Sequence, residues 1–417
     1  MKLNLTETLY ALSDALDTVQ KEMGGITNAH GKHVAVLSFM MGSNMGYSNS
    51  MLNDLVGLAI LHDNAFTEYV REEYNNGKLL DYNELKKDNV STEVRTGFLT
   101  SPRHNVIGEE NIKLIPFSND VKNVILYHHE NANGTGPLHK TYKDTPKMAQ
   151  IIHITDIYDV MNNINTITKE QFELSIEKMK SLEGSLFTKE MVDIFIKSIT
   201  FDLIKEIREN GEINFLRNNL KSYAKDYTDE EIKGICKFFS NIVDYKSSQT
   251  KNHSLGVAEK CEIMADYYGF DPDKKIRFYF AGAFHDVGKL LVTNEILEKP
   301  STLTKDEYNL IKDHAYGTYL ILSQIEGLED ICKWSSRHHE KINGTGYPFN
   351  LKAHELSFED RLLAVIDIFQ ALIEKRSYKR EFRLYDTFAI LRQMATDNLL
   401  DYNIVNDVIK VFNNNMN

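Results

Sequence analysis

The sequence predicts an all-α protein built from two tandem helical domains of one fold. The chain of 417 residues is long enough for two or three domains, each with its own core. Its 7 prolines and 22 glycines are few for that length, which favours long helices over many short strands. Ten of the 14 histidines fall on a pattern that occurs twice, so the two halves are expected to share one architecture.

The repeat consists of histidines and aspartates that keep one order in both halves. The second half carries His253, His285, Asp286, His314, His338, His339 and Asp367. The first half carries His30, His62, Asp63, His104, His128, His129 and Asp156. Paired positions are 223 residues apart up to the aspartate of the His-Asp doublet and 210 or 211 apart afterwards, so about 13 extra residues lie between 63 and 104. We expect domains at 1–204 and 205–417, joined by a continuous helical connection near residue 205.

Helices of the second half can be placed from their spacing and capping residues. An apolar stripe at helical spacing follows His253 and stops at Gly269. The pair Asp271-Pro272 is typical of an N-cap followed by proline at the first helical position. The segments 304–307 and 357–360 resemble capping boxes and predict two more helix starts. Asp367 lies on the last of these helices among apolar neighbours, so its carboxylate is expected to point inward.

Charge and cysteine content narrow the class of protein. Sixty acidic against 48 basic residues give a net charge of -12, which argues against DNA, RNA or an anionic membrane as the main partner. An anionic small molecule would need a local cationic pocket. Three scattered cysteines in no CxxC spacing suit a reducing compartment. The N-terminus reads as an amphipathic helix, and no apolar run approaches the roughly 18 residues of a membrane span, so we expect a cytoplasmic protein.

Each half offers five histidines and two aspartates but no thiolate. Such nitrogen and oxygen ligands suit Fe, Mn, Zn, Ni or Co at two adjacent sites. A His-Asp doublet usually lies at a helix end, where the aspartate can bridge two ions while the histidine binds one. Two ions about 3.5 to 4 Å apart can acidify a bridging water and neutralise phosphate oxygens. Histidines scattered by chance are the alternative, but five in one order at a fixed offset do not fit it.

The second half closely resembles the HD-GYP family of the HD phosphohydrolase superfamily. The motifs are HSLGVA (253–258), HDVGK (285–289), HHE (338–340) and GTGYP (344–348), and the resemblance covers roughly 235–417. It implies that the seven histidines and aspartates of this half hold two divalent ions, Fe or Mn. Some family members hold a third ion through an acid at the place of Gln249, which favours two ions here. Gln370 replaces the second aspartate of the family's DxxDA motif.

The resemblance also implies the groups that meet the substrate. Asp286 and Lys289 are the expected catalytic residues, with the lysine at the scissile phosphate or the developing leaving-group charge. Arg376 and Lys379 match the family's phosphate clamp, although a solvated helix end remains their alternative. The implied substrate-binding residues are Gly346, Tyr347, Pro348, Arg376 and Lys379.

The first half keeps the ligands and lacks the substrate groups. Phe66 stands in place of Lys289, the GTGP at 134–137 has no tyrosine, and Asn165 and Thr168 occupy the clamp positions. This indicates a structural or regulatory domain. Whether its histidines bind metal or are remnants that bind none stays open.

The expected activity is a metal-dependent phosphodiesterase that hydrolyses cyclic di-GMP to pGpG and onward to GMP. Another cyclic dinucleotide such as 3',3'-cGAMP is the alternative substrate, and a receptor or scaffold without enzymatic activity is the alternative function. Lys289 and His253 count against a receptor, because a binder needs no activated hydroxide. A homodimer or a signalling-protein partner is left open.

Overall fold

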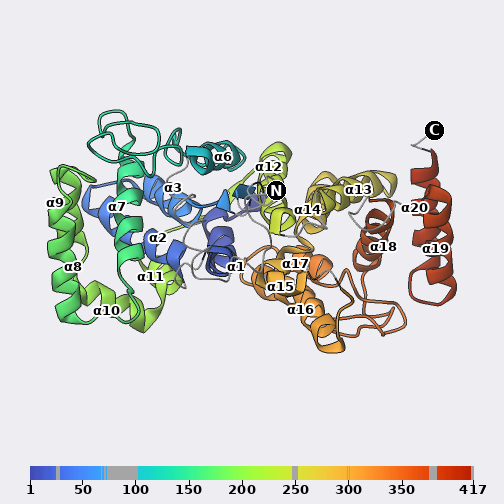
Figure 1. The fold of residues 1–417 in the computed structure, drawn as a ribbon. Helices are drawn as coiled ribbons and strands as arrows, with labels where there is room; N and C mark the ends of the chain where they lie inside the picture. The colour runs from blue at the N-terminus through green and yellow to red at the C-terminus, as the bar shows by residue number, and fades with distance from the viewer. Residues whose placement is uncertain are drawn as a thin grey trace. The chain divides into compact units, whose positions relative to one another are not determined.

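The computed structural model describes residues 1–24, 29–66, 68–69, 72, 102–246, 252–297, 299, 301–374 and 383–414. Helices dominate these residues (Figure 1), which confirms the all-α class. Two short strands, β1 (Lys2–Leu3) and β2 (Lys225–Asp226), pair antiparallel with Lys2 opposite Asp226.

The chain divides into an N-terminal unit, Asn4–Ala224, and a C-terminal unit, Met1–Leu3 with Lys225–Asn417. This division differs from the expected one at 204/205. The reason is that α10 (Phe201–Asn210) and α11 (Glu212–Asn219) belong to the N-terminal unit, where α11 packs on α2. The prediction of a continuous helical connection near residue 205 is also wrong. Gly211 at φ 77° separates α10 from α11, and no helix covers 220–228.

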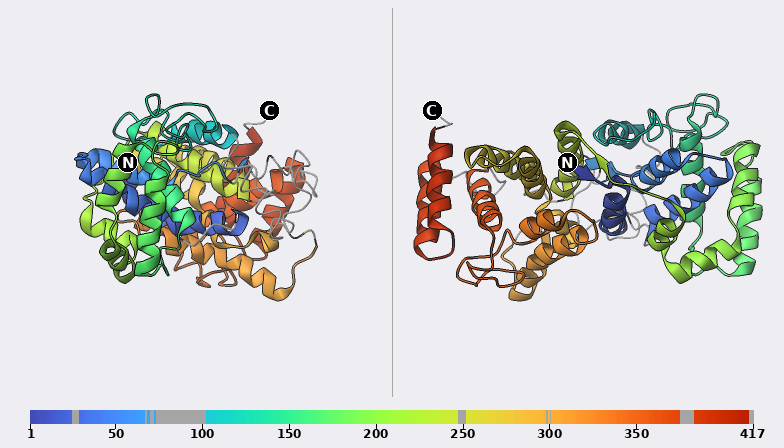
Figure 2. Two further views of the ribbon diagram at one scale, coloured as in Figure 1. Left: turned by 60° about the vertical axis from the view of Figure 1, so that its left-hand side comes forward. Right: turned by 180° about the vertical axis from the view of Figure 1, so that it is seen from behind.

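The N-terminal unit is organised around α2, whose residues are almost all buried. Helices α1, α3, α7, α9 and α11 pack against α2. Besides α10 and α11, the described helices of this unit are α1 (Leu5–Gly24), α2 (His30–Asn44), α3 (Asn49–Ile60), α6 (Pro102–Ile112), α7 (Lys147–Met161), α8 (Lys169–Ser181) and α9 (Lys189–Ser198). Figure 2 shows them from two further sides.

In the C-terminal unit, α13 packs on α14 and α18, and the short 3-10 helix η2 packs on α16. Its elements are α12 (Asp229–Lys246), α13 (His253–Tyr267), α14 (Pro272–Phe284), η2 (Val287–Leu291), α15 (Asn294–Leu297), α16 (Lys305–Leu322), α17 (Glu329–Ser336), α18 (Phe358–Ile373), α19 (Leu384–Thr396) and α20 (Tyr402–Asn414). By the offsets of the repeat, α1, α2, α3, α6 and α7 correspond to α12, α13, α14, α16 and α18.

The predicted helix starts are confirmed. The Asp271 side chain accepts a hydrogen bond from the Lys274 backbone N–H at the start of α14. Both capping boxes are formed, at 304–307 before α16 and at 357–360 before α18. The apolar stripe after His253 is fully buried, and the helix that carries it ends before Gly269, which adopts a φ of 66°.

The glycine of the HDVGK motif allows η2 to touch α16. The Gly288 N–H donates to the Thr318 hydroxyl at 3.0 Å, and the same hydroxyl donates to the His285 carbonyl at 2.9 Å. A Cβ at Gly288 would lie 2.0 Å from the His314 carbonyl oxygen. The motif therefore needs glycine so that the His-Asp doublet can approach the helix that carries His314.

We predict that Gly288→Ala destabilises the C-terminal unit by about 3 kcal/mol, because the atoms in its way are backbone atoms that cannot move aside. Denaturant unfolding followed by circular dichroism measures the change. Gly269→Asn is the control, since this position has open space and a positive φ that asparagine tolerates. Equal stability of Gly288→Ala and the wild type would contradict the packing argument.

Candidate metal centres

The seven predicted ligands of the C-terminal unit come from five separate places and meet in its interior. His253 is the first residue of α13, and His285 and Asp286 follow the end of α14. The remaining ligands lie on α16 (His314), after α17 (His338, His339) and on α18 (Asp367). The doublet lies at a helix end, as predicted.

Two carboxylates connect the imidazoles. Asp286 Oδ2 lies 3.2 Å from His285 Nε2, and its Oδ1 lies 3.3 Å from His314 Nε2 and 3.9 Å from His338 Nε2. Asp286 therefore faces ligands on both of its oxygens, as a bridging carboxylate must.

Asp367 faces the other side of the same cluster. Its Oδ1 lies 3.1 Å from His253 Nε2 and 3.7 Å from His285 Nε2, and its Oδ2 lies 3.9 Å from His339 Nδ1. The ligands thus fall into overlapping groups with spacing suited to metal ions: His253, His285 and Asp367; His285, Asp286 and His338; His314, His338 and His339.

Backbone carbonyls orient three of the histidines in the same way. The Nδ1 atoms of His285, His314 and His338 each lie 2.5 to 2.7 Å from the carbonyl oxygen three residues earlier. This interaction leaves Nε2 as the atom that faces the carboxylates. Because neutral imidazole with one nitrogen hydrogen-bonded outward is the usual form of a histidine ligand, the arrangement is preorganised for metal binding.

The protonation states fit metal ligation. Burial, reinforced by neighbouring imidazoles, lowers the pKa of His338 and lowers that of His339 to about 3. Burial alone would raise the pKa of Asp286, but its electrostatic interactions with His285 and the Lys289 ammonium group hold it well below its usual range. The imidazoles of His338 and His339 are therefore neutral beside the ionised carboxylate of Asp286.

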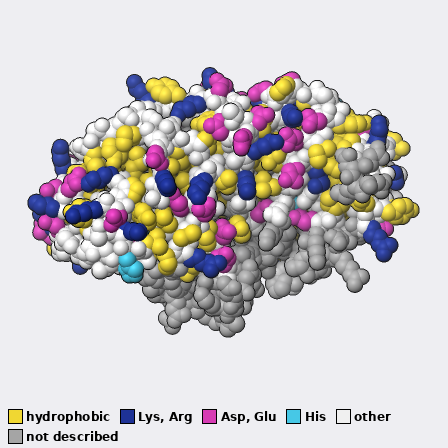
Figure 3. Space-filling model, turned by 90° about the horizontal axis from the view of Figure 1, so that it is seen from above, with side chains coloured by type: hydrophobic (Ala, Val, Ile, Leu, Met, Phe, Trp, Pro, Cys, Tyr) yellow, Lys and Arg dark blue, Asp and Glu magenta, His cyan; other side chains and the backbone are white. Residues whose placement is uncertain are grey.

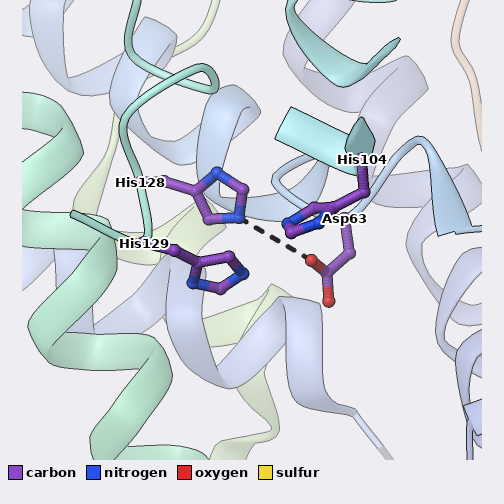
Figure 4. Close-up of side chains that lie close together, drawn as sticks. All are labelled: Asp63, His104, His128 and His129. Atoms are coloured by element: carbon purple, nitrogen blue, oxygen red, sulfur yellow. Dashed lines mark ion pairs between the residues drawn. The ribbon is translucent and has the colours of Figure 1, made fainter. Parts of the chain in front are cut away.

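The N-terminal unit brings its predicted ligands together in the same manner. Asp63 lies 3.4 Å from His62 Nε2 and 3.8 Å from His128 Nε2. In Figure 4 the side chains of Asp63, His104, His128 and His129 converge on one point. Asp156 completes the set, with its carboxylate 3.3 Å from His30 Nε2 and 3.6 Å from His129 Nδ1.

Buried polar atoms without hydrogen-bond partners test whether these clusters fit metal ions. In the C-terminal unit His285 Nε2 is such an atom among the described residues. In the N-terminal unit the same holds within the described ranges for His62 Nε2, Asp63 Oδ1, His128 Nε2, His129 Nε2 and Asp156 Oδ2. Buried polar atoms are rarely left unpaired, and divalent ions coordinated by these imidazoles and carboxylates would satisfy them.

A series of buried ion pairs lies behind the N-terminal cluster and connects His30 to Glu212. Asp159 accepts from His30 Nδ1 at 2.7 Å and from His33 Nδ1 at 2.8 Å, and His33 Nε2 lies 3.1 Å from Glu212 Oε1 on α11. Sequence reasoning missed His33 and Asp159. The signal that could have found Asp159 is its place in the repeat, since it is the second aspartate of a DxxD motif that Gln370 interrupts in the other half.

Of the predicted substrate groups, the described residues place Lys289 and the GYP loop. Lys289 Nζ lies 2.5 Å from Asp286 Oδ2. The Tyr347 ring lies 4.7 Å from the His339 ring, and Lys312 Nζ lies 5.4 Å from the centre of the Tyr347 ring. Sequence reasoning missed Lys312, which forms no ion pair with any residue that the structure describes. Arg376, Lys379 and Gln249 lie outside the described residues.

The glutamate of HHE anchors the loop that follows it. Glu340 accepts from the Phe349 N–H at 2.7 Å and from the Leu351 N–H at 2.9 Å, so one carboxylate holds the segment that follows GYP. A Cβ at Gly346 would lie 2.4 Å from Glu340 Cα, so the loop can close only over glycine. Glu130 holds the Leu138 and Lys140 amides of the N-terminal unit in the same way.

Phe66 is buried, at 2% exposure, at the N-terminal position that corresponds to Lys289. At this position the N-terminal unit therefore carries an apolar ring where the C-terminal unit carries an ammonium group. On the face shown in Figure 3, basic and acidic side chains are interspersed over the coloured atoms. None of the described helices combines the length and the apolar character needed to cross a membrane.

Comparison with known proteins agrees with this geometry. Residues 237–404 match the HD domain family. The chain is 26% identical to 3'3'-cGAMP-specific phosphodiesterase 1 of Vibrio cholerae over 98% of its length and 91% of the relative. It is 33% identical to a cyclic di-GMP phosphodiesterase of Pseudomonas aeruginosa over 42% of its length and 43% of that relative. A crystal structure of a cyclic GMP-AMP-specific phosphodiesterase of V. cholerae has the same fold, with a TM-score of 0.63, 19% identity and coverage of 99% and 98% of the two chains.

We predict that His33 stabilises the N-terminal unit in a pH-dependent manner. Burial alone would lower its pKa, but the carboxylates of Asp159 and Glu212 raise it to about 9. The stabilisation is then complete below the unfolded value of about 6.5 and is lost as the pH rises through 9. Denaturant unfolding should show that His33→Gln lowers the free energy of unfolding by up to about 3 kcal/mol at pH 6 and by much less at pH 10. The same loss at both pH values would contradict this assignment.

Proposed function

We propose that this chain, as a member of the HD-GYP family of HD-domain phosphohydrolases, is a metal-dependent phosphodiesterase for a cyclic dinucleotide whose active site lies in the C-terminal unit. The observation that carries the proposal is the convergence of five imidazoles around the carboxylates of Asp286 and Asp367, with Lys289 beside Asp286. A receptor would have no need for this combination of a metal cage and an adjacent ammonium group.

The residues of the C-terminal unit have separate proposed roles in metal binding, charge stabilisation and substrate contact. When bound, two divalent ions supply a hydroxide nucleophile and neutralise phosphate oxygens. Asp286 faces His285 with one carboxylate oxygen and His314 with the other, while Asp367 belongs to the group that contains His253. Lys289 is placed to stabilise charge on the phosphate or the leaving oxygen. Tyr347 lies beside His339 and Lys312 lies over the Tyr347 ring, so this pair suits contact with another part of the substrate.

We infer that 3',3'-cGAMP is the preferred substrate and that cyclic di-GMP is the alternative. The support is the extent of similarity, because the relative that matches both units carries the name of a 3'3'-cGAMP-specific enzyme. The relative named for cyclic di-GMP matches less than half of the chain. For the metal we propose Fe or Mn, because imidazoles dominate the ligand set.

For the N-terminal unit we propose metal binding in a structural or regulatory role. Its cluster has buried ligand atoms without partners among the described residues, which supports binding of an ion. Phe66 in place of Lys289 supports the absence of a chemical step.

The repeat provides a matched pair of variants that tests where the reaction occurs. We expect His285→Ala to abolish hydrolysis of 3',3'-cGAMP and of cyclic di-GMP, because it removes a ligand shared by two groups of the C-terminal cluster. His62→Ala, the equivalent change in the N-terminal unit, should leave turnover largely intact. Product chromatography of reactions supplied with Mn²⁺ measures both. An active His285→Ala, or an inert but folded His62→Ala, would show that the active site is assigned wrongly.

The role of Lys289 can be separated from metal binding. We expect Lys289→Ala to lower kcat by about 10² to 10³, because an ammonium group that stabilises transition-state charge is lost. Metal content per chain, measured by elemental analysis after anaerobic purification, should equal that of the wild type. Loss of metal in step with activity would assign Lys289 to the ligand cage instead.

A further inference from the structure

The first histidine of each half has the same surroundings but a different second partner. His253 and His30 are each the first residue of a helix, after a residue with a φ of 66°. Each directs Nε2 at the aspartate of the cluster, at 3.1 Å from Asp367 and 3.3 Å from Asp156. Each also places Nδ1 against a second carboxylate. The two imidazoles are therefore held in equivalent orientations.

The second carboxylate comes from different places in the two halves. In the N-terminal unit it is Asp159, three residues after Asp156 on α7, at 2.7 Å from His30 Nδ1. In the C-terminal unit it is Glu374, seven residues after Asp367 at the end of α18, at 3.0 Å from His253 Nδ1. The residue that corresponds to Asp159 by the offset of the repeat is Gln370.

Gln370 does not replace the missing carboxylate. A Cβ added to Gly256 would lie 2.4 Å from Gln370 Nε2, so the amide lies against that glycine. Gln370 Oε1 is buried and has no hydrogen-bond partner among the described residues. In the N-terminal unit the place of Gly256 is taken by His33, which binds Asp159. The C-terminal unit thus has a Gly-Gln pair where the N-terminal unit has a His-Asp pair.

A carboxylate at Nδ1 matters because His253 presents Nε2 to the metal site. The Nδ1–H donates to Glu374, which fixes the tautomer and the ring orientation and makes Nε2 a stronger ligand. Glu374 is well placed for this role, since only 11% of its side chain is exposed and only 4% of that of His253. An amide in its place could accept the same hydrogen bond but would not supply the negative charge.

We propose that Glu374 is the positioning residue of His253 and that it has taken over the function which Asp159 performs for His30. The proposal rests on the metal centre of the proposed function, and it assigns to Glu374 a contribution to metal affinity rather than to the chemical step. It also explains why the C-terminal unit keeps a complete ligand set although Gln370 interrupts the DxxD motif.

The test compares Glu374→Gln with the double variant Gln370→Asp/Glu374→Gln in the full chain. All variants carry His62→Ala, which removes a ligand of the N-terminal cluster. Mn²⁺ affinity is measured by competition with a chromogenic chelator, and circular dichroism of the metal-free proteins checks folding. Glu359→Gln is the control, because Glu359 lies on the same helix, pairs with Lys274 and is similarly buried.

We expect Glu374→Gln to weaken Mn²⁺ binding about 10- to 100-fold, as is typical for loss of a carboxylate behind a histidine ligand. The double variant should recover most of the affinity, because an aspartate at the corresponding position reaches His30 in the other half. The control should bind as the parent does. An unchanged affinity in folded Glu374→Gln would overturn the proposal, as would an equal loss in the single and double variants.

Mn²⁺ binding is measured without substrate, so this result and the proposed activity can fail separately. Absence of hydrolysis with intact Mn²⁺ binding would count against the proposed function alone. In an active protein, Glu374→Gln should raise the Mn²⁺ concentration needed for half-maximal activity and should leave kcat at saturating Mn²⁺ nearly unchanged. A lowered kcat at saturation would show that Glu374 acts in the chemical step instead.

Discussion

The buried pair of aspartates in each unit is the constraint on which the rest of the structure depends. Asp286 and Asp367 are both almost fully buried, and an ionised carboxylate cannot remain in such surroundings without positive charge or hydrogen-bond donors close by. Imidazoles and Lys289 surround them in the C-terminal unit. The helix ends, the orienting carbonyls and the anchored loops all serve to bring these partners to the two carboxylates.

The internal repeat separates what the cage needs from what catalysis needs. Both units keep five histidines and two aspartates, and both anchor the loop after HHE through a glutamate, Glu130 or Glu340. The difference lies at the edge of the cage, where Phe66 replaces Lys289 and the tyrosine of GYP is missing from the first half. The residues proposed to hold metal and the residues proposed to contact phosphate are thus separate parts of the same scaffold.

The residues behind the ligands are more variable than the ligands themselves. His30 is held by Asp159, which also binds His33. His253 is held by Glu374, which lies about one turn beyond the corresponding position, at the end of α18. A hydrogen bond to an imidazole requires only that a carboxylate oxygen reach Nδ1, so several helix positions can supply it. A metal ligand has less freedom, because it must meet the other ligands at one point.

The sequence by itself determined the all-α class, the repeat, the candidate metal ligands and the main helix starts, because each depends on local spacing or on residue type. Periodic apolar residues, capping pairs such as 304–307 and the offset between His30 and His253 need no three-dimensional information. Only the tertiary structure decided that Glu374 supports His253, that α10 and α11 belong to the N-terminal unit, and that Lys312 approaches Tyr347. These features depend on contacts between residues far apart in the chain, and such contacts are set by how helices pack rather than by the residues within any one of them.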